Sequence, residues 1–258
     1  MTKYLLIVVL CCLSFFAKSQ NNSSDVADLI KMLNNATNVS ANDIKPSYEF
    51  TGDVVINITS TNKEGVKKNE GRFQYFFHKD AKERLGIKPL GVKKEEAVFI
   101  VMENGKMITL SEKSKTAVIM AFEELNQQIE SINSSSSKKE IAPEFVKTGN
   151  KKVINGYECE EYVSEDAESR TICWFTDKIP FDLTAVFKSM GLGGKESIEA
   201  LPSNMPQGFM MNLNHYDKKK NTFSDISASL INLNKPTTIS TEGYKAMNLV
   251  DLMQENND

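Results

Sequence analysis

The residues whose chemistry stands out are two cysteines in the stretch GYECEEYVSEDAESRTICWF, residues 156–175. Cys159 and Cys173 lie fourteen positions apart. Three uses of such a pair are open: a disulfide, two buried free thiols, or metal or redox chemistry. Metal binding needs about four ligands, and only His78 and His215 add imidazole nitrogen to the chain. Redox catalysis favours a CxxC spacing and an activated thiolate, and the spacing is absent here.

A hairpin that pairs Cys159 directly with Cys173 predicts a structural disulfide. In that register Glu161 faces Thr171 and Val163 faces Ser169. Directly opposed residues have Cβ atoms about 4.5–5.5 Å apart, which is near the separation that a disulfide needs. We therefore expect a Cys159–Cys173 disulfide that closes the hairpin.

The remaining candidate chemistry gives no positive case for an enzyme. His78 lies on the polar face of an expected strand, and His215 lies near a strand end, so both are expected at the surface. No serine lies in a GxSxG motif, and GLGGK at 191–195 lacks the phosphate-loop pattern GxxxxGK[ST]. We expect no catalytic residues, no metal and no cofactor.

The strands expected to carry these residues follow from alternating hydrophobicity. In YEFTGDVVINIT, residues 48–59, apolar side chains occupy most even positions, which is typical of a half-buried strand. Phe73, Tyr75 and Phe77 alternate in the same way. Further strands are expected at 97–102, 106–110, 116–120, 147–153, 157–164, 170–176, 209–216 and 222–232, with a short one after Pro236. The Asn–Gly pairs at 104–105 and 155–156 predict tight turns between strands.

Apolar spacing of three and four residues predicts four helices, within 21–41, 122–132, 180–190 and 244–253. The charged segment 80–96 and the glycine-rich segment 191–208 are expected to be loops. Tight turns between neighbouring strands predict an antiparallel sheet with helices gathered on one face, which is an α+β fold.

The first nineteen residues have the pattern of a cleaved secretory signal. Lys3 precedes an apolar run that is too short for a comfortable membrane span. Ala17 and Ser19 then place small residues before a cut at Gln20, and the cut removes the cysteines at positions 11 and 12. We expect a signal at 1–19, an N-terminal helical and polar segment at 20–46, one domain at 47–253 and a disordered tail at 254–258.

Charge and compartment limit the partners. The formal net charge is −3, with lysines scattered along the chain, so there is no basic surface typical of nucleic-acid binding. No later run is apolar for long enough to cross a membrane, so we expect no span after signal cleavage. The predicted location is the periplasm or the extracellular space, where disulfides form.

The run KTGNKKVINGYECEEYVSEDAESRTICWFTDKIP, residues 147–180, resembles the DUF4412 family of exported bacterial proteins. The family's run is K-x-G-x-K-x-I-x-G-Y-x-C followed by a strand that contains tryptophan. It is matched here by Lys147, Gly149, Lys152, Ile154, Gly156, Tyr157, Cys159 and Trp174, with one extra residue before Lys152. The resemblance extends over about residues 48–240 and implies no established activity.

The element order also resembles the LolA/LppX-like fold, a curved, incomplete barrel with helices on its concave face. Some members of that fold carry lipids or lipoproteins, so the resemblance implies an apolar cleft between sheet and helices. In this chain the lining would come from Phe73, Tyr75, Phe77, Phe122 and Met210. The same side chains could equally fill a closed core.

Two functions are therefore open. The first is an exported, non-enzymatic protein that binds a lipid or another apolar ligand. The second is a structural or protein-interaction module of the cell envelope with a filled core, whose partner would be another envelope protein. Met190, Met205, Met210 and Met211 flank the glycine-rich segment, and flexible thioethers suit irregular apolar ligands as well as cores.

Overall fold

Almost all of the regular secondary structure in the described chain is β-strand. The structure is a computed structural model that describes residues 40–61, 64–81, 84–93, 97–121, 144–181 and 206–248. Within these ranges the one helical turn is the 3-10 helix η1 (Ala41–Asp43), where the side chain of Ser40 accepts the N–H of Asn42. The strands are β1 (Ser47–Phe50), β2 (Gly52–Thr61), β3 (Lys67–Phe77), β4 (Leu85–Leu90), β5 (Val98–Glu103), β6 (Lys106–Ser111), β7 (Thr116–Ala121), β8 (Val146–Ile154), β9 (Tyr157–Glu165), β10 (Ser169–Thr176), β11 (Phe209–Asp217), β12 (Thr222–Asn232), β13 (Thr237–Ser240) and β14 (Lys245–Asn248).

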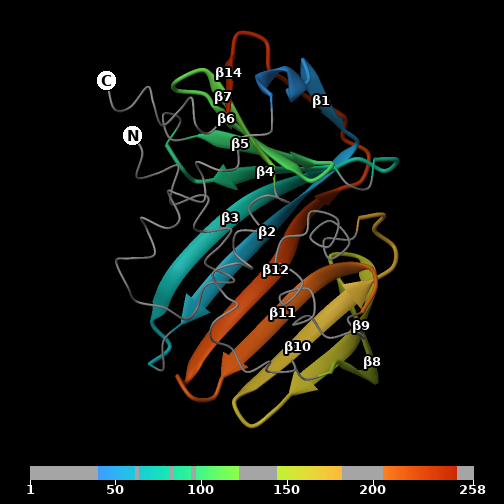
Figure 1. The fold of residues 1–258 in the computed structure, drawn as a ribbon. Coiled ribbons are helices and arrows are strands. Elements are labelled where there is room, and N and C mark those ends of the chain that lie inside the picture. The colour runs from blue at the N-terminus through green and yellow to red at the C-terminus, as the bar shows by residue number, and fades with distance from the viewer. Residues whose placement is uncertain are drawn as a thin grey trace, which may run out of the picture.

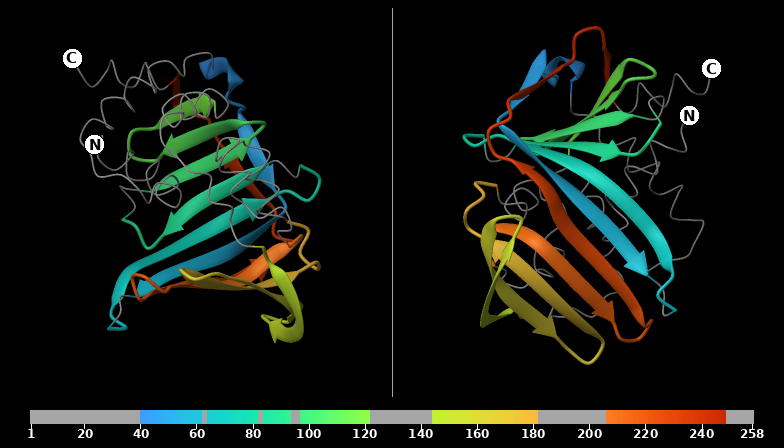
Figure 2. Two further views of the ribbon diagram at one scale, coloured as in Figure 1. Left: turned by 60° about the horizontal axis from the view of Figure 1, so that its bottom comes forward. Right: turned by 180° about the vertical axis from the view of Figure 1, so that it is seen from behind.

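Twelve of these strands form one sheet in the order β14-β7-β6-β5-β4-β3-β2-β12-β11-β10-β9-β8. The sheet is open and curved (Figures 1 and 2). Its neighbouring strands are antiparallel, except that β14 runs parallel to β7. The N-terminal meander β2–β7 and the C-terminal meander β8–β12 meet where β2 pairs with β12. No helix in the described part of the chain is long and apolar enough to cross a membrane.

A two-stranded strap covers one face of the sheet. Its strands are β1 and β13, which pair in register from Ser47 opposite Ser240. Phe50 of the strap packs its ring against Phe76 and Phe99, with centroids 5.7 and 6.0 Å apart. We call this side of the twelve-stranded sheet the strap face.

The opposite side, which we call the broad face, is the one that carries Phe73, Tyr75 and Phe77 of β3. Strand pairing brings side chains from β2, β4, β5, β6, β7 and β12 to the same side. They form a cluster that includes the buried residues Val54, Ile56, Leu85, Ile87, Ile100, Met102, Met107, Val118, Met120 and Ala228.

The expected α+β class is wrong. The described chain is nearly all strand, and no helix among its described residues packs on a concave face. The other three helices were predicted at 21–41, 122–132 and 180–190. Most residues of each of these segments lie outside the described residues.

The predicted helix at 244–253 is wrong where it can be compared. Lys245–Asn248 form strand β14, in which Met247 pairs with Val118 and is buried. Pairing with the edge strand β7 and burial of Met247 favour a strand here more than the helical spacing of apolar residues favours a helix. Tertiary contacts often override local propensity in this way.

Candidate ligand-binding face

The aromatic side chains of β3 form the centre of the broad face. Phe73, Tyr75 and Phe77 occupy alternate positions, so the pleat of the strand points them to one side. Phe77 is buried, whereas Phe73 and Tyr75 are half-buried and pack against the cluster. On β2, Ile56 stands opposite Phe73 and Val54 opposite Tyr75. The result is a continuous apolar surface across two strands.

One end of this surface is filled by the protein's own side chains. The ring of Phe181, which follows β10, stacks on Phe77 with a centroid distance of 5.3 Å and an interplanar angle of 16°. Phe181 also contacts the ring of Phe209 at 5.9 Å. The chain that leaves β10 therefore crosses onto the broad face and closes it near the end of β3.

Methionines line the broad face over β5, β6 and β7. Met107 stands opposite Met102 on one side and opposite Met120 on the other, and all three are buried. Unbranched thioether side chains adapt to irregular shapes at small cost. This part of the face can therefore repack more easily than a surface of branched side chains.

The broad face is less covered over β2, β11 and β12. Ile58 of β2 stands opposite Ile226 of β12, which in turn stands opposite Leu213 of β11. All three side chains are half-buried, in contrast to the buried cluster beside them. These residues extend the apolar surface toward the hairpin ends of the sheet.

The structure brings three of the five predicted lining residues together. Phe73, Tyr75 and Phe77 share the broad face, whereas Phe122 lies outside the described residues. Met210 is half-buried opposite Phe175 and is not in the cluster, although Phe209 and Met211 on either side of it are. A bulge in the β10–β11 pairing at this point breaks the simple alternation that the prediction assumed.

The sequence analysis did not single out the half-buried residues of β12 and β11 on the broad face. Ile226 and Leu213 lie in strands that the sequence predicts. Their place beside Ile58 on one face depends on the pairing of β2 with β12. That pairing joins segments that are distant in sequence, so no local sequence pattern predicts it.

The predicted register around the cysteines is wrong. Cys173 stands opposite Tyr162, and Glu161 stands opposite Trp174, which is a shift of three residues from the predicted pairing. Because Cys159 shares a face with Glu161, and Cys173 is the neighbour of Trp174, the two thiols point to opposite faces. Both cysteines are free and buried in the structure, and the predicted disulfide is not present.

Burial makes both thiols poor nucleophiles. Burial raises the pKa of Cys173 to about 12. Burial also raises the pKa of Cys159, whose Sγ lies 3.3 Å from the carbonyl oxygen of Tyr157. Each thiol is therefore protonated at neutral pH, and thiolate chemistry is disfavoured.

The two histidines have different local roles. His78 accepts the backbone N–H groups of Asp80 and Ala81 on Nδ1, at 3.2 and 3.0 Å, and so orders the turn after β3. His215 of β11 shares a hydrogen bond of 2.9 Å between its Nδ1 and Oγ1 of Thr171 on β10. Alternation places this pair on the broad face, beyond Leu213.

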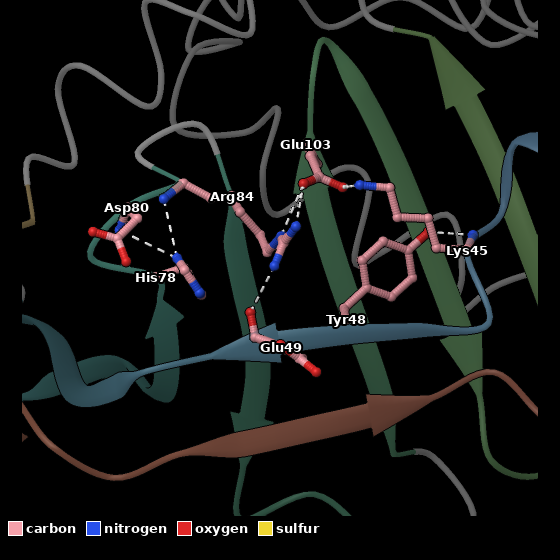
Figure 3. A network of polar contacts seen from close by, with 8 residues as sticks. Lys45, Tyr48, Glu49, His78, Asp80, Arg84 and Glu103 are labelled. Atoms are coloured by element: carbon pink, nitrogen blue, oxygen red, sulfur yellow. Dashed lines mark hydrogen bonds and ion pairs between the residues drawn. The ribbon is translucent and has the colours of Figure 1, made fainter.

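A buried carboxylate, which the sequence analysis did not single out, ties the strap to the sheet (Figure 3). Glu103 accepts hydrogen bonds from Nζ of Lys45 at 2.7 Å and from Nε of Arg84 at 2.8 Å. Arg84 also donates to the backbone carbonyl of Glu49 in β1 at 2.9 Å. We call Lys45, Arg84 and Glu103 the clasp.

Electrostatics favour the ionised form of the clasp carboxylate. Burial raises the pKa of Glu103, but the hydrogen bonds from Lys45 and Arg84 outweigh it, so the pKa is lowered overall. The guanidinium and ammonium groups are satisfied within the clasp, so it is best explained as a structural connection.

Across the ranges that the structure describes, no group of three or more His, Cys, Asp or Glu side chains is placed to hold a metal ion. Within the described part of the chain, the broad face is the strongest candidate for a functional surface.

Solved structures show some likeness to this chain. An uncharacterized conserved protein from Thermus thermophilus has 8% identity and a TM-score of 0.38, with 87% of this chain and 98% of that one covered. A LolA superfamily protein from Nitrosomonas europaea has 9% identity and a TM-score of 0.31, with coverage of 80% and 93%. LprF from Mycobacterium bovis has 9% identity and a TM-score of 0.31, with coverage of 78% and 91%.

Comparison with curated proteins finds no match. The family comparison is more informative, because it matches residues 50–232, which span β2 to β12 and include the whole β8–β10 region. The resemblance seen in the stretch around the two cysteines is thereby confirmed: the chain belongs to the DUF4412 family, a domain of unknown function.

Proposed function

We propose that this protein is an exported, non-enzymatic binding protein that holds an apolar ligand against the broad face of its sheet. The observation that carries the proposal is the half-buried apolar region beside the buried cluster. Ile58, Phe73, Tyr75 and Ile226 extend this region over β2, β3 and β12. Contiguous apolar surface that is not fully covered is characteristic of ligand-binding and interaction sites.

The state of the reactive groups supports binding over catalysis. The thiols of Cys159 and Cys173 are buried and have raised pKa values. The carboxylate of the clasp, Glu103, is occupied by Lys45 and Arg84. These groups are used inside the fold and do not form an acid–base pair facing a cleft.

Export is supported by the sequence. Residues 1–19 combine a lysine, a short apolar run and small residues before Gln20, which is the pattern of a secretory signal. In this proposal the protein works in the periplasm or outside the cell, as one domain within residues 47–253.

The test uses the neutral apolar dye N-phenyl-1-naphthylamine, whose fluorescence rises when it leaves water. We expect saturable binding by protein purified from cells that express the full-length sequence. Ile226→Asn places an amide in the apolar region and should weaken dye binding at least about tenfold, because an unpaired polar group is costly there.

The matched control is Leu230→Asn on the same strand, where the side chain is exposed, and it should leave dye binding unchanged. Circular dichroism checks that both variants fold. Absence of dye binding by the unaltered protein, or equal binding by the two variants, would refute the proposed site.

A second candidate function, protein interaction, is favoured by strand β8. This strand lies at one edge of the sheet, and the first eight of its nine residues are exposed. An exposed edge can accept an added strand from a partner through backbone hydrogen bonds. Amide hydrogen exchange with and without envelope extract separates the two functions. Protection confined to β8 favours the interaction module, and protection over β2, β11 and β12 favours the ligand.

A further inference from the structure

The strap covers the strap face over β3 and β5–β7, and a polar patch lies beyond it on β2, β11 and β12. On β11 and β12, Asn212 stands opposite Ser227, and Asn214 stands opposite Asp225. Ser227 in turn stands opposite Asn57 on β2. These five residues alternate along their strands with the apolar side chains of the broad face, so they share the opposite face. None of the five is buried, and Asn214 is exposed. We call them the amide patch.

Two asparagines hold the carboxylate of the amide patch in place. Oδ1 of Asp225 accepts hydrogen bonds from Nδ2 of Asn212 at 3.0 Å and from Nδ2 of Asn214 at 2.5 Å. Nδ2 of Asn212 also donates to the backbone carbonyl of Ile226 at 3.1 Å. Within the described chain, these bonds leave Oδ2 of Asp225 and the two amide oxygens without a donor. Carboxylate and amide oxygens each accept hydrogen bonds on two lone pairs, so the patch offers three fixed acceptors to a ligand.

An exposed aromatic side chain lies beside these acceptors. Tyr216 stands opposite Phe223, and this pair is two residues along the strands from Asn214 and Asp225, a distance of about 6.6 Å. The two rings stack with centroids 4.4 Å apart and an interplanar angle of 17°, and the Tyr216 hydroxyl donates to Oδ1 of Asn221 at 2.9 Å. Stacking orders the Phe223 ring, although 53% of the residue is exposed. The ring can therefore pack against an apolar face of a ligand at a small cost in side-chain entropy.

The charges and acceptors of the patch select a class of ligand. Asp225 repels a carboxylate or phosphate, and the cation at the border of the patch, Arg72, donates its Nε to Oδ1 of Asn57 at 3.2 Å. A wholly apolar ligand would bury Asp225 and the amides without hydrogen bonds, which is costly. The patch suits a molecule that carries several O–H donors beside a C–H surface. A sugar ring has both, with hydroxyl groups around its rim and C–H groups on its faces.

We propose that the amide patch binds a neutral carbohydrate. Hydroxyl groups of the sugar donate to Asp225, Asn212 and Asn214, while one face of a sugar ring packs on Phe223. This site goes beyond the proposed function, because it lies on the opposite face of the sheet and takes a different class of ligand. Removing the carboxylate or the exposed ring should therefore weaken carbohydrate binding and leave dye binding on the broad face unchanged.

The experiment is affinity electrophoresis of the protein in native gels that contain dextran, laminarin, galactomannan or hydroxyethyl cellulose, with alginate as an anionic comparison. We expect at least one of the four neutral polysaccharides to retard the protein relative to a gel without polysaccharide. Asp225→Ala should weaken this binding at least about tenfold, because the ligand loses a charged acceptor and the two amides lose the group that orients them. Phe223→Ala should weaken it about fivefold, because the sugar ring loses its aromatic contact.

Each variant has a matched control. Glu158→Ala removes a largely exposed carboxylate from β9, and so changes the net charge by the same amount as Asp225→Ala. Leu230→Ala removes an exposed apolar side chain from the strand that carries Phe223. Both controls should be retarded as strongly as the unaltered protein, and circular dichroism checks that all four variants fold.

Three results would overturn the proposal. They are no retardation by any neutral polysaccharide, retardation by alginate alone, and equal retardation of the two patch variants and their controls. Because the side chain of Phe223 is exposed, Phe223→Ala keeps the test decisive if Asp225→Ala does not fold.

Discussion

Replacing Glu103 with glutamine tests whether the clasp holds the strap on the sheet. The substitution keeps the shape of the side chain but removes its charge. Only 10% of the side chain of Glu103 and 16% of that of Arg84 are exposed, whereas Lys45 is 46% exposed. The variant therefore leaves a largely buried guanidinium without its carboxylate.

The magnitude follows from the individual contacts. Hydrogen bonds to charged groups contribute about 1.5–3 kcal/mol, and an ion pair with a well-exposed lysine contributes about 0–1 kcal/mol. We expect Glu103→Gln to lower the free energy of unfolding by about 3 kcal/mol in total, which is typical for breaking one partner of a largely buried pair. For a chain of this size, that corresponds to a melting temperature about 6–12 °C lower.

The assay is thermal unfolding followed by circular dichroism, with Glu158→Gln as the matched control. Glu158 pairs with Lys151 at 3.0 Å, but both side chains are more than half exposed, so its loss should cost at most about 0.5 kcal/mol. Equal melting temperatures for the two variants would refute the assignment of the clasp as a stabilising connection.

The pH dependence gives an independent check. Because the pKa of Glu103 is lowered in the folded protein, its contribution is complete above the ordinary glutamate value of 4.5 and is lost as pH falls through the lower folded-state pKa. The difference in stability between the unaltered protein and Glu103→Gln should therefore be constant near neutral pH and shrink in acid. A difference that grows in acid would contradict this reasoning.

Three further substitutions or measurements test other parts of the structure. Cys159 and Cys173 should resist a thiol reagent in the folded protein, because burial keeps both thiols protonated, and both should react in guanidinium. An intact mass that lacks two hydrogens would show a disulfide instead. Phe77→Ala should lower the free energy of unfolding by about 3–5 kcal/mol, because the ring is buried. Val153→Ala, at an exposed position of β8, should change it by at most about 0.5 kcal/mol. Similar urea midpoints for the two variants would contradict the packing described for Phe77. Gly208→Ala should destabilise the folded protein by more than about 1 kcal/mol, because φ is +109° at this position and the new Cβ would lie 2.6 Å from a carbonyl oxygen at the end of β10. An unchanged melting temperature would show that this backbone adjusts freely.

Local patterns in the sequence predicted most strands and the tight turns. The Asn–Gly pairs at 104–105 and 155–156 have positive φ at both residues, as their turns require. Period-two alternation located β3, and the other strand predictions located β5–β13 to within a few residues. It also marked 48–59 as one strand, which the structure divides between two sheets. Tyr48 and Phe50 belong to the strap and pack on the strap face, whereas Val54 and Ile56 lie on the broad face.

The features that the sequence could not predict are strand register and the pairing of strands that are distant in the chain. In the β9–β10 hairpin, Oδ1 of Asp166 accepts the N–H groups of Glu168 and Ser169, which closes a tight turn. That turn fixes the register three residues away from the one that would have opposed the cysteines. Strand β4 lies within the charged segment expected to be a loop, because Leu85 and Ile87 become buried against β3 and β5. The broad face as a surface likewise required the β2–β12 pairing.

The pairing of β2 with β12 also determines when this protein can fold. Asn232 donates to the buried Asp53 across 179 positions of the chain, and the strap joins segments that are farther apart still. Contacts over such separations form slowly, because the entropy of closing the loop must be overcome before they stabilise anything. The centre of the sheet cannot assemble until β12 is available. Until then β2 and the strap strand β1 lack their partners, so the two meanders cannot join into one sheet.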